Sequence, residues 1–265
     1  MPWSRCGLAA LLVFVPMLAT PAAAATAATV AEQAADQQPP APVPAPAPPA
    51  ARPQGAPAPP PPAAPGTPSR FLVVLDAAHG GDDLGGHLSS GQFEKNVNLA
   101  LSVRLRSLLG ARGIQVITTR ESDQSVPLDR RATIANHAGA GACISLHSAE
   151  TGTGVHLFVS SLAPATSTRW VAWNTAQAGW VTRSLVLAGV LNSALLHAGM
   201  SVTLGRAPLP AIENMTCPAV TIEIAPERDS ERKITAEPDD PDYQARVAGT
   251  LAAAILEWRA EGHQP

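Results

Sequence analysis

The most constraining stretch of the sequence runs from Phe71 to Lys95 and joins a short apolar segment to a glycine-rich loop. The five apolar residues FLVVL have the length of one buried strand of a parallel sheet, and they end at Asp76. His79 follows in the loop, which closes at Glu94, where a helical pattern begins. Open α/β sheets bind ligands in loops at the carboxyl ends of their strands. The stretch therefore predicts a ligand-binding loop with a histidine near its start and a glutamate at its end.

Two later apolar segments also end in side chains that can bind a metal, namely His147 and Glu223. Three strand ends and one helix start thus deliver two histidines and two glutamates. Two histidines and one glutamate around zinc, with a fourth position left to water, form a known catalytic arrangement. A remaining glutamate is what such a site needs as its general base. The pattern therefore predicts a catalytic metal site.

Each of these four residues also has an ordinary structural explanation. His79 could be a turn residue, and His147 could be a hydrogen-bonded histidine of the core. Glu94 could be favoured only because carboxylates stabilise helix N-termini. Glu223 is harder to explain in this way, because an unpaired carboxylate in the apolar segment TIEIAP is costly to bury. The occurrence of all four together favours the metal site.

Five segments of the chain carry a family resemblance: DAAHGG, GQFEKNVNLALSVRL, TTRESDQSVPLDRRATIAN, SLHS and PAVTIE. In this order they resemble the type-3 catalytic domain of the zinc-dependent N-acetylmuramoyl-L-alanine amidases of bacterial cell walls. The resemblance implies that His79, Glu94 and His147 are zinc ligands and that Glu223 is the catalytic glutamate. It further implies hydrolysis of the amide between N-acetylmuramic acid and L-alanine of peptidoglycan, in cell-wall remodelling or daughter-cell separation.

The sequence departs from the family pattern beside three of the site residues. Ala77-Ala78 stands where Pro-Gly is usual, and Ser148-Ala149 stands where Ala-Asn is usual. Residues 224–226 read Ile-Ala-Pro, where an aliphatic residue followed by Gly-Phe is common. None of these positions is a ligand, so the departures concern substrate contacts and the pocket wall. Two alternatives stay open: a secreted zinc peptidase with another peptide substrate, and a non-catalytic peptidoglycan-binding protein.

Other titratable residues have less defined roles. Asp76 is expected either to orient His79, as metal-bound imidazoles commonly require, or to bind backbone amides at the end of its strand. His87 lies in the glycine-rich loop and could face substrate. The remaining histidines are expected to be structural or solvated: His137, His156, His197 and His263.

Composition divides the chain into a leader, a linker and a domain. Residues 1–25 combine Arg5, an apolar segment and a run of alanines, which predicts a secretory signal that is either cleaved or kept as an anchor. Residues 26–69 are Ala- and Pro-rich, and 15 of the 27 prolines lie at positions 39–68. Such a segment cannot offset the entropy of folding. We expect a disordered spacer, with a recognition role for its Pro repeats as the alternative.

Residues 70–262 are expected to form one catalytic domain, which is long enough to bury a core. Strand and helix patterns alternate through it, which predicts an α/β fold with a mostly parallel twisted sheet covered by helices on both faces. Strands are expected at residues 71–75, 114–118, 142–146, 155–159 and 219–224, and helices at residues 94–112, 127–137, 180–196 and 243–258.

Charge and cysteine content limit the partners and the compartment. A net charge of −3 gives no electrostatic case for binding nucleic acid or an anionic membrane. We expect an exported monomer of the periplasm or cell envelope that acts on peptidoglycan, without a stable membrane span once the signal is cleaved. Any activator protein is unspecified. Cys143 and Cys217 are either a disulfide or two buried thiols.

Overall fold

The computed structural model describes residues 71–165 and 172–262. The predicted signal and linker, residues 1–25 and 26–69, lie outside the described residues and stay predictions. The elements in chain order are β1 (Leu72–Ala77), α1 (Glu94–Gly110), β2 (Gln115–Thr118), α2 (Leu128–Ala138), β3 (Ala142–Ser148), β4 (Val155–Ser160), the 3-10 helix η1 (Trp173–Gly179), α3 (Val181–His197), β5 (Val202–Ala207), α4 (Pro210–Glu213), β6 (Ala219–Ile224), β7 (Glu227–Arg228), β8 (Ile234–Ala236) and α5 (Pro241–Ala260).

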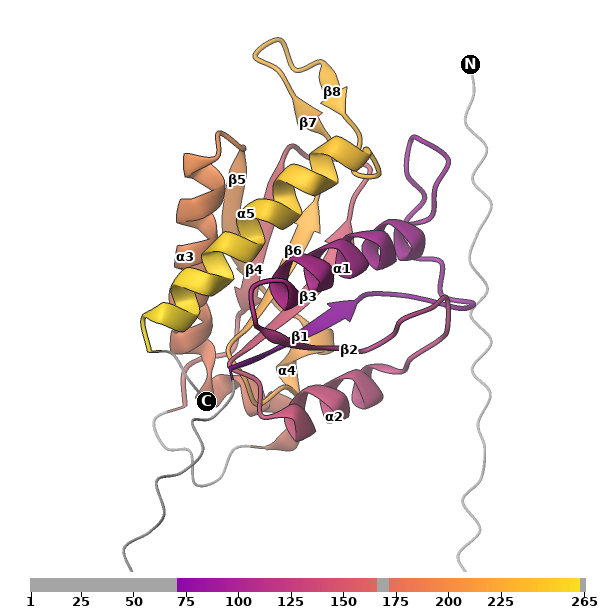
Figure 1. Ribbon diagram of the computed structural model, residues 1–265. Helices are drawn as coiled ribbons and strands as arrows, with labels where there is room; N and C mark the ends of the chain where they lie inside the picture. Colours follow the sequence, from indigo (N-terminus) through magenta and orange to yellow (C-terminus); the bar gives the residue numbers. More distant parts are fainter. Residues whose placement is uncertain (1–70, 166–171, 263–265) are drawn as a thin grey trace, which may run out of the picture. The chain divides into compact units, whose positions relative to one another are not determined.

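The main sheet has six strands in the order β2-β1-β3-β6-β4-β5 (Figure 1). β2, β1, β3 and β6 are parallel neighbours, whereas β4 runs antiparallel to β6 and parallel to β5. The predicted α/β fold with a mostly parallel sheet is therefore confirmed. The direction of β4 matters for the site, because the start of β4 lies at the edge where β3 and β6 end.

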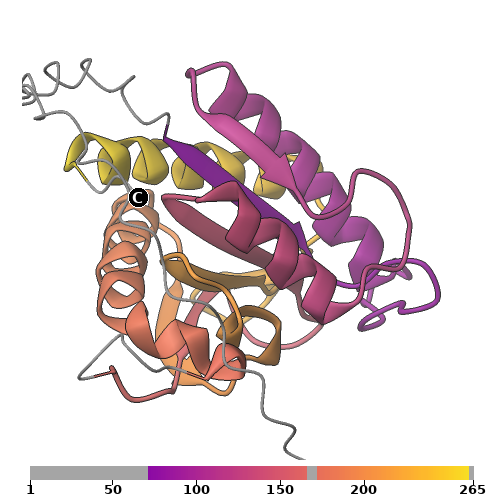
Figure 2. The same ribbon diagram turned by 90° about the horizontal axis from the view of Figure 1, so that it is seen from below.

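Helices cover both faces of this sheet, as Figures 1 and 2 show. α1, α3 and α5 pack on one face and form the larger hydrophobic core with the inward side chains of the strands. α2 and α4 pack on the other face around a smaller core. In α1 the spacing of four places Leu101, Leu105 and Leu109 on one side, and all three are fully buried. Gly113 follows with a φ of 75°, which lets the chain leave the helix and enter β2.

Several elements were not expected from the sequence. β5 is an edge strand with the sequence VTLGRA, in which a glycine and an arginine interrupt the apolar pattern. Such an edge strand carries a weak pattern because only part of it is buried. η1, α4 and the hairpin of β7 and β8 are too short to give a periodic signal.

Cys143 and Cys217 form a disulfide, so the first of the two sequence alternatives is the one observed. Cys143 lies near the start of β3, and Cys217 precedes β6, its parallel neighbour. Both residues belong to the smaller core, on the face covered by α2 and α4. The bond therefore ties together the two strands that carry His147 and Glu223.

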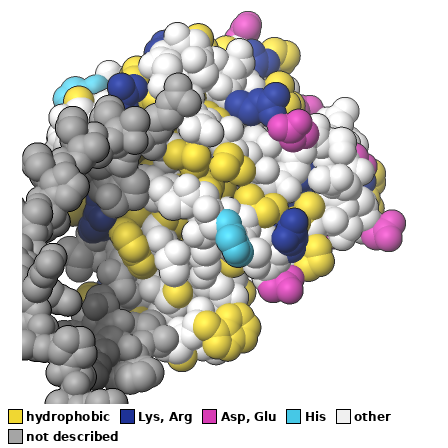
Figure 3. Space-filling model, turned by 60° about the horizontal axis from the view of Figure 1, so that its bottom comes forward, with side chains coloured by type: hydrophobic (Ala, Val, Ile, Leu, Met, Phe, Trp, Pro, Cys, Tyr) yellow, Lys and Arg dark blue, Asp and Glu magenta, His cyan; other side chains and the backbone are white. Residues whose placement is uncertain are grey.

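The described surface shows no dominant charge on the side seen in Figure 3. Acidic and basic side chains are interspersed there with hydrophobic ones wherever described residues are visible. No described helix is by itself long and apolar enough to cross a membrane. η1 and α3 reach that length and hydropathy only when taken together, and they meet at a bend of 61°.

Candidate metal centre

Three predicted ligands meet at the carboxyl edge of the parallel strands. His79 follows β1, Glu94 begins α1 and His147 is the second-last residue of β3. One ligand atom from each residue lies within 4.8 Å of the other two. Glu94 stands between the rings, with Oε2 3.2 Å from His79 Nε2 and Oε1 2.9 Å from His147 Nδ1. Two imidazoles and a carboxylate thus converge on one point and could hold a metal ion.

Backbone and side-chain donors fix the carboxylate of Glu94 in this position. The N–H of Gly86 donates to Oε2 at 2.8 Å, and the N–H of Ser148 donates to Oε1 at 3.2 Å. Asn98, one turn further along α1, donates from Nδ2 to Oε1 at 3.3 Å and accepts from the Ser148 hydroxyl at 2.8 Å. Ser148 is one of the departures from the family pattern, and here it helps to hold Glu94, a candidate ligand.

The glycine-rich loop requires glycine at position 85, where its backbone packs against His79 and Glu94. Gly85 has a φ of +66°, and a Cβ there would lie 2.7 Å from the His79 ring and 2.8 Å from the Glu94 side chain. Any larger residue at this position would displace one of the two ligands. The loop composition thus follows from the close packing of its backbone against the site.

The electrostatics of the cluster suit a cation. Burial by itself would raise the pKa of Glu94, but hydrogen bonds with His147, His79 and Gly86 hold this pKa far below its usual range. The hydrogen bond with Glu94 raises the pKa of His79, against the opposing effect of burial. Glu94 is therefore ionised at neutral pH and favours positive charge beside it, whether a proton on His79 or a metal ion.

Asp83 orients the His79 ring from the side away from the cluster. Both of its carboxylate oxygens lie 2.9 Å from His79 Nδ1, and Oδ1 also accepts the N–H of Gly85 at 3.2 Å. A proton on Nδ1 leaves Nε2 with its lone pair facing Glu94 and His147. His79 itself has a φ of 63°, unusual for a residue with a side chain, so its direction depends on these contacts.

The prediction that Asp76 orients His79 or binds backbone amides is wrong. Its carboxylate accepts three side-chain hydrogen bonds instead, from Thr119 Oγ1 at 2.6 Å, Arg131 Nη1 at 2.6 Å and Ser145 Oγ at 3.0 Å. Asp76 still lies inside β1, two positions before the chain turns into the loop, and is almost fully buried. Asp76 therefore has a structural role, as the carboxylate that pairs with the buried Arg131.

Two buried arginines hold the backbone that leads into His79. Arg131 donates to the carbonyls of Ala77 and His79, both at 2.7 Å. Arg120 donates to the carbonyls of Ala77 at 2.8 Å and Ala78 at 3.1 Å. Three successive carbonyls at the end of β1 are thus capped by guanidinium groups. Ala77-Ala78, which replaces the usual Pro-Gly, is fixed by this pair.

Glu223 lies beside the cluster without belonging to it. It is the register partner of His147 in the parallel pairing of β3 and β6, so both side chains project from the same face of the sheet. Glu223 is half-buried, and its carboxylate makes no hydrogen bond to any described residue. Glu223 thus places a carboxylate without a partner among the described residues next to a candidate metal ligand.

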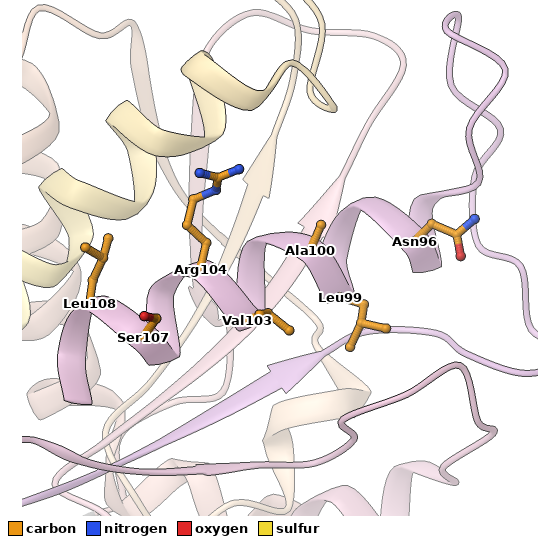
Figure 4. Close-up of a pocket in the computed structure, with 7 residues that line it drawn as sticks. All are labelled: Asn96, Leu99, Ala100, Val103, Arg104, Ser107 and Leu108. Atoms are coloured by element: carbon orange, nitrogen blue, oxygen red, sulfur yellow. The ribbon is translucent and has the colours of Figure 1, made fainter. Parts of the chain in front are cut away.

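A cavity of about 220 Å³ opens beside the ligands. His79, Asp83, Arg131 and His147 line it together with Ala211 of α4 and the segment 125–128 that enters α2. A larger hollow of about 650 Å³ runs along α1 and is shown in Figure 4. Its described lining is Asn96, Leu99, Ala100, Val103, Arg104, Ser107 and Leu108, which include no metal-binding group, so it is not the candidate site.

The other histidines lie apart from the three ligands. His87 is exposed and packs edge-to-face on Phe93, with ring centroids 5.3 Å apart. His137 and His197 are exposed on α2 and α3, and His156 lies on β4. His263 is outside the described residues.

Sequence reasoning missed Asp83, Asn98, Arg120 and Arg131. Asp83 stands four residues after His79 inside the glycine-rich loop, and Asn98 stands four residues after Glu94 on a helix. Each spacing was a usable signal for a partner of a ligand. The two arginines lie in the TTRESD and LDRRAT segments, far from the ligands in sequence, and only the fold shows their contacts.

The fold and the cluster define an α/β domain that can bind a metal ion at the carboxyl edge of its parallel strands. A family model described as Amidase_3, N-acetylmuramoyl-L-alanine amidase, matches residues 73–257. The chain therefore belongs to the N-acetylmuramoyl-L-alanine amidase family.

Individual relatives agree with this assignment. The amidase AmiA of Escherichia coli is 40% identical over 86 residues, which are 32% of this chain and 30% of that protein. The germination-specific amidase of Bacillus subtilis is 26% identical over 212 residues, covering 73% of this chain and 82% of its own length. The match with AmiA therefore covers less than a third of that protein, whereas the match with the germination-specific amidase covers most of it.

A solved structure shares the fold. The catalytic domain of the amidase CwlV from Bacillus (Paenibacillus) polymyxa superposes with a TM-score of 0.55 at 24% identity. The match covers 72% of this chain and 98% of that domain. At this identity the likeness supports the fold alone.

Proposed function

We propose that this protein hydrolyses the amide between N-acetylmuramic acid and L-alanine in peptidoglycan, with a zinc ion held by His79, Glu94 and His147. The observation that carries the proposal is the position of Glu223. It lies next to His147 on the same sheet face, as a half-buried carboxylate without a hydrogen-bond partner among the described residues. A metal-ligand cluster with an unpaired carboxylate at its side can supply both the metal ion and the general base for amide hydrolysis.

The donor set fits zinc. Two imidazole nitrogens and one carboxylate, with a cavity opening beside them, match a catalytic zinc site that keeps a position for water. Asp83 provides the carboxylate that metal-bound histidines commonly bind through their second nitrogen. When bound, zinc would lower the pKa of a water molecule to about 7 and polarise the substrate carbonyl.

The residues of the chain would have two roles in this reaction, proton transfer by Glu223 and positioning of His79. Glu223 takes a proton from the attacking water and delivers it to the amide nitrogen as the C–N bond breaks. The products are a free carboxyl group on the lactyl ether and a free amino group on L-alanine. Asp83, Arg120 and Arg131 keep His79 oriented, so the site does not need to reorganise during the reaction.

The compartment follows from the substrate. Peptidoglycan lies outside the cytoplasm, and residues 1–25 have the composition of a secretory signal. We therefore place the protein in the periplasm or cell envelope. Residues 26–69 would act as a spacer between the leader and the catalytic domain.

Digestion of purified peptidoglycan tests this function. The zinc-loaded protein should release intact stem peptides with a new amino group on L-alanine, and chelation should stop the release until zinc is restored. Release of peptide fragments cut elsewhere would instead indicate a peptidase. Binding to the wall without any release, by zinc-loaded protein, would indicate a non-catalytic peptidoglycan-binding protein.

A further inference from the structure

A third polar side chain continues the row formed by His147 and Glu223. In the antiparallel pairing of β4 and β6, Glu223 is the register partner of His156. The three residues therefore lie side by side on three neighbouring strands and project from one face of the sheet. Cβ atoms of directly opposed residues are about 4.5–5.5 Å apart. Glu223 thus stands between a candidate metal ligand and a second histidine.

The ring of His156 is held by the segment that precedes its strand. The N–H of Thr153 donates to His156 Nε2 at 3.4 Å. Gly152 has a φ of +100°, and a Cβ at this position would lie 2.8 Å from the same nitrogen. The ring also stacks on Phe158, with 6.3 Å between centroids and 17° between planes. These contacts fix both the position and the tautomer of the ring.

The tautomer leaves a donor available beside Glu223. Because Nε2 accepts a backbone N–H, the neutral ring carries its proton on Nδ1. His156 Nδ1 has no hydrogen-bond partner in the described part of the chain, and the Glu223 carboxylate has none there either. Both residues are only partly buried, and neither group is among the buried polar atoms that lack a partner, so each is open to a new partner. The His156 Nδ1–H is a hydrogen-bond donor and the Glu223 carboxylate is an acceptor, and the two lie on neighbouring strands.

Although the two groups make no hydrogen bond in this structure, we propose that His156 is a positioning residue that donates its Nδ1–H to one carboxylate oxygen of Glu223 when the Glu223 side chain turns toward it. The bond directs the other oxygen toward the water that attacks the amide. His156 stands on the side of Glu223 away from His147, so it acts through Glu223 and not on the metal. This inference rests on the proposed function, because it gives Glu223 the role of general base.

Three substitutions of His156 test the proposal, because they separate the role of Nδ1 from that of Nε2. His156→Phe keeps the ring and its stacking on Phe158 but removes both nitrogens. His156→Asn keeps a donor near the place of Nδ1, and His156→Gln keeps an acceptor near the place of Nε2. His197→Phe, at the exposed end of α3, is the matched control.

The expected results are a lower kcat with an unchanged KM and unchanged zinc content. A hydrogen bond to a charged group corresponds to about 10–100-fold in rate, so His156→Phe and His156→Gln should lose about that factor. His156→Asn should recover most of the loss, and His197→Phe should equal the wild type. Recovery by Gln and not by Asn would overturn the proposal, because His156 would then only anchor Thr153. A raised KM at unchanged kcat, or full activity of His156→Phe, would also overturn it.

A second measurement does not depend on activity. In ¹⁵N spectra of the zinc-loaded protein, the Nδ1 resonance of His156 should shift when Glu223 is changed to Ala, and the Nε2 resonance should stay in place. An unmoved Nδ1 resonance would contradict the contact. A wild-type protein that failed to release stem peptides would refute the proposed function, and the spectra would still decide the contact.

Discussion

Asp83 holds the ring of His79 through Nδ1, with both of its carboxylate oxygens 2.9 Å from that nitrogen. The contact joins the two ends of one short segment of the glycine-rich loop, which also contains Gly80 and Gly81. It gives His79 a defined direction although the residue has a left-handed backbone conformation. The loop thus holds one nitrogen of His79 in a fixed direction at the candidate metal site.

Removal of this contact should weaken metal binding. Partners of metal-bound histidines typically contribute 10–100-fold to metal affinity, so Asp83→Ala should lose about that factor in zinc affinity. Competition with a chromophoric chelator measures the change. Asp82→Ala is the control, because Asp82 is exposed and adjacent but does not contact His79. Equal zinc affinity in Asp83→Ala and the wild type would show that His79 is held by other contacts.

The buried pair of Arg131 and Asp76 should matter mainly for stability. Both side chains are nearly fully buried, and Nη1 lies 2.6 Å from Oδ1. Arg131→Met would leave the Asp76 charge buried without its main partner, and such changes cost about 3–5 kcal/mol of unfolding free energy. Urea unfolding measures the loss. The neighbouring exposed Arg130→Met should change stability by less than about 0.5 kcal/mol, and similar losses in both variants would contradict this account.

The Cys143–Cys217 bond closes a loop with a sequence separation of 74 residues. A disulfide that closes a loop of this size restricts the unfolded chain, and its removal typically costs about 2–5 kcal/mol. Peptide mapping without reduction should recover the two cysteines as one linked peptide. The Cys143→Ala, Cys217→Ala double variant should unfold at a lower temperature. Two free thiols in protein exported to an oxidising compartment would rule out the bond.

The pKa shifts in the cluster predict how pH affects the metal-free protein. Glu94 has a lowered pKa, so its contribution to stability is present above its ordinary value of 4.5 and is lost as the pH falls through the lowered pKa. His79 has a raised pKa, so its contribution is present below 6.5 and is lost as the pH rises through the raised pKa. Both contributions are therefore present between pH 4.5 and 6.5.

Protons and zinc compete for His79, so zinc should stabilise the protein less in this window than at higher pH. The rise in Tm on adding zinc should be smaller at about pH 5.5 than at about pH 8, where His79 more readily gives up its proton. Magnesium serves as the control, since it prefers oxygen ligands and should not shift Tm at either pH. An equal rise with zinc at both pH values would contradict a raised His79 pKa.

The sequence predicted the ends of the parallel strands well, because each buried strand is a short apolar run that stops at a polar residue. His79, Glu94 and His147 could be placed together for this reason, and the structure brings them within 4.8 Å. The partners of these residues could not be placed in the same way. Arg131 reaches His79 across 52 residues of sequence, and no local pattern reports such a contact.

The wrong prediction for Asp76 and the overlooked position of His156 have different causes. Asp76 follows an apolar run and precedes His79 closely, but it still lies inside β1, so its side chain projects from a face of the sheet and meets Ser145, its register partner on β3. The position of His156 depends on the antiparallel direction of β4, which cannot be read from the sequence of that strand. Topology, and not residue type, places it beside Glu223.

The central claim is that Glu94 binds the metal and Glu223 moves the proton. Zinc content and the rate of stem-peptide release, measured together on Glu223→Gln and Glu94→Gln, test this division most directly. Glu223→Gln should keep its zinc and lose about 10²–10⁴-fold in rate, because an amide cannot accept the proton. Glu94→Gln should lose both zinc and activity, as should His147→Ala. A Glu223→Gln protein without zinc beside a zinc-loaded Glu94→Gln protein would show that the two glutamates have the opposite roles.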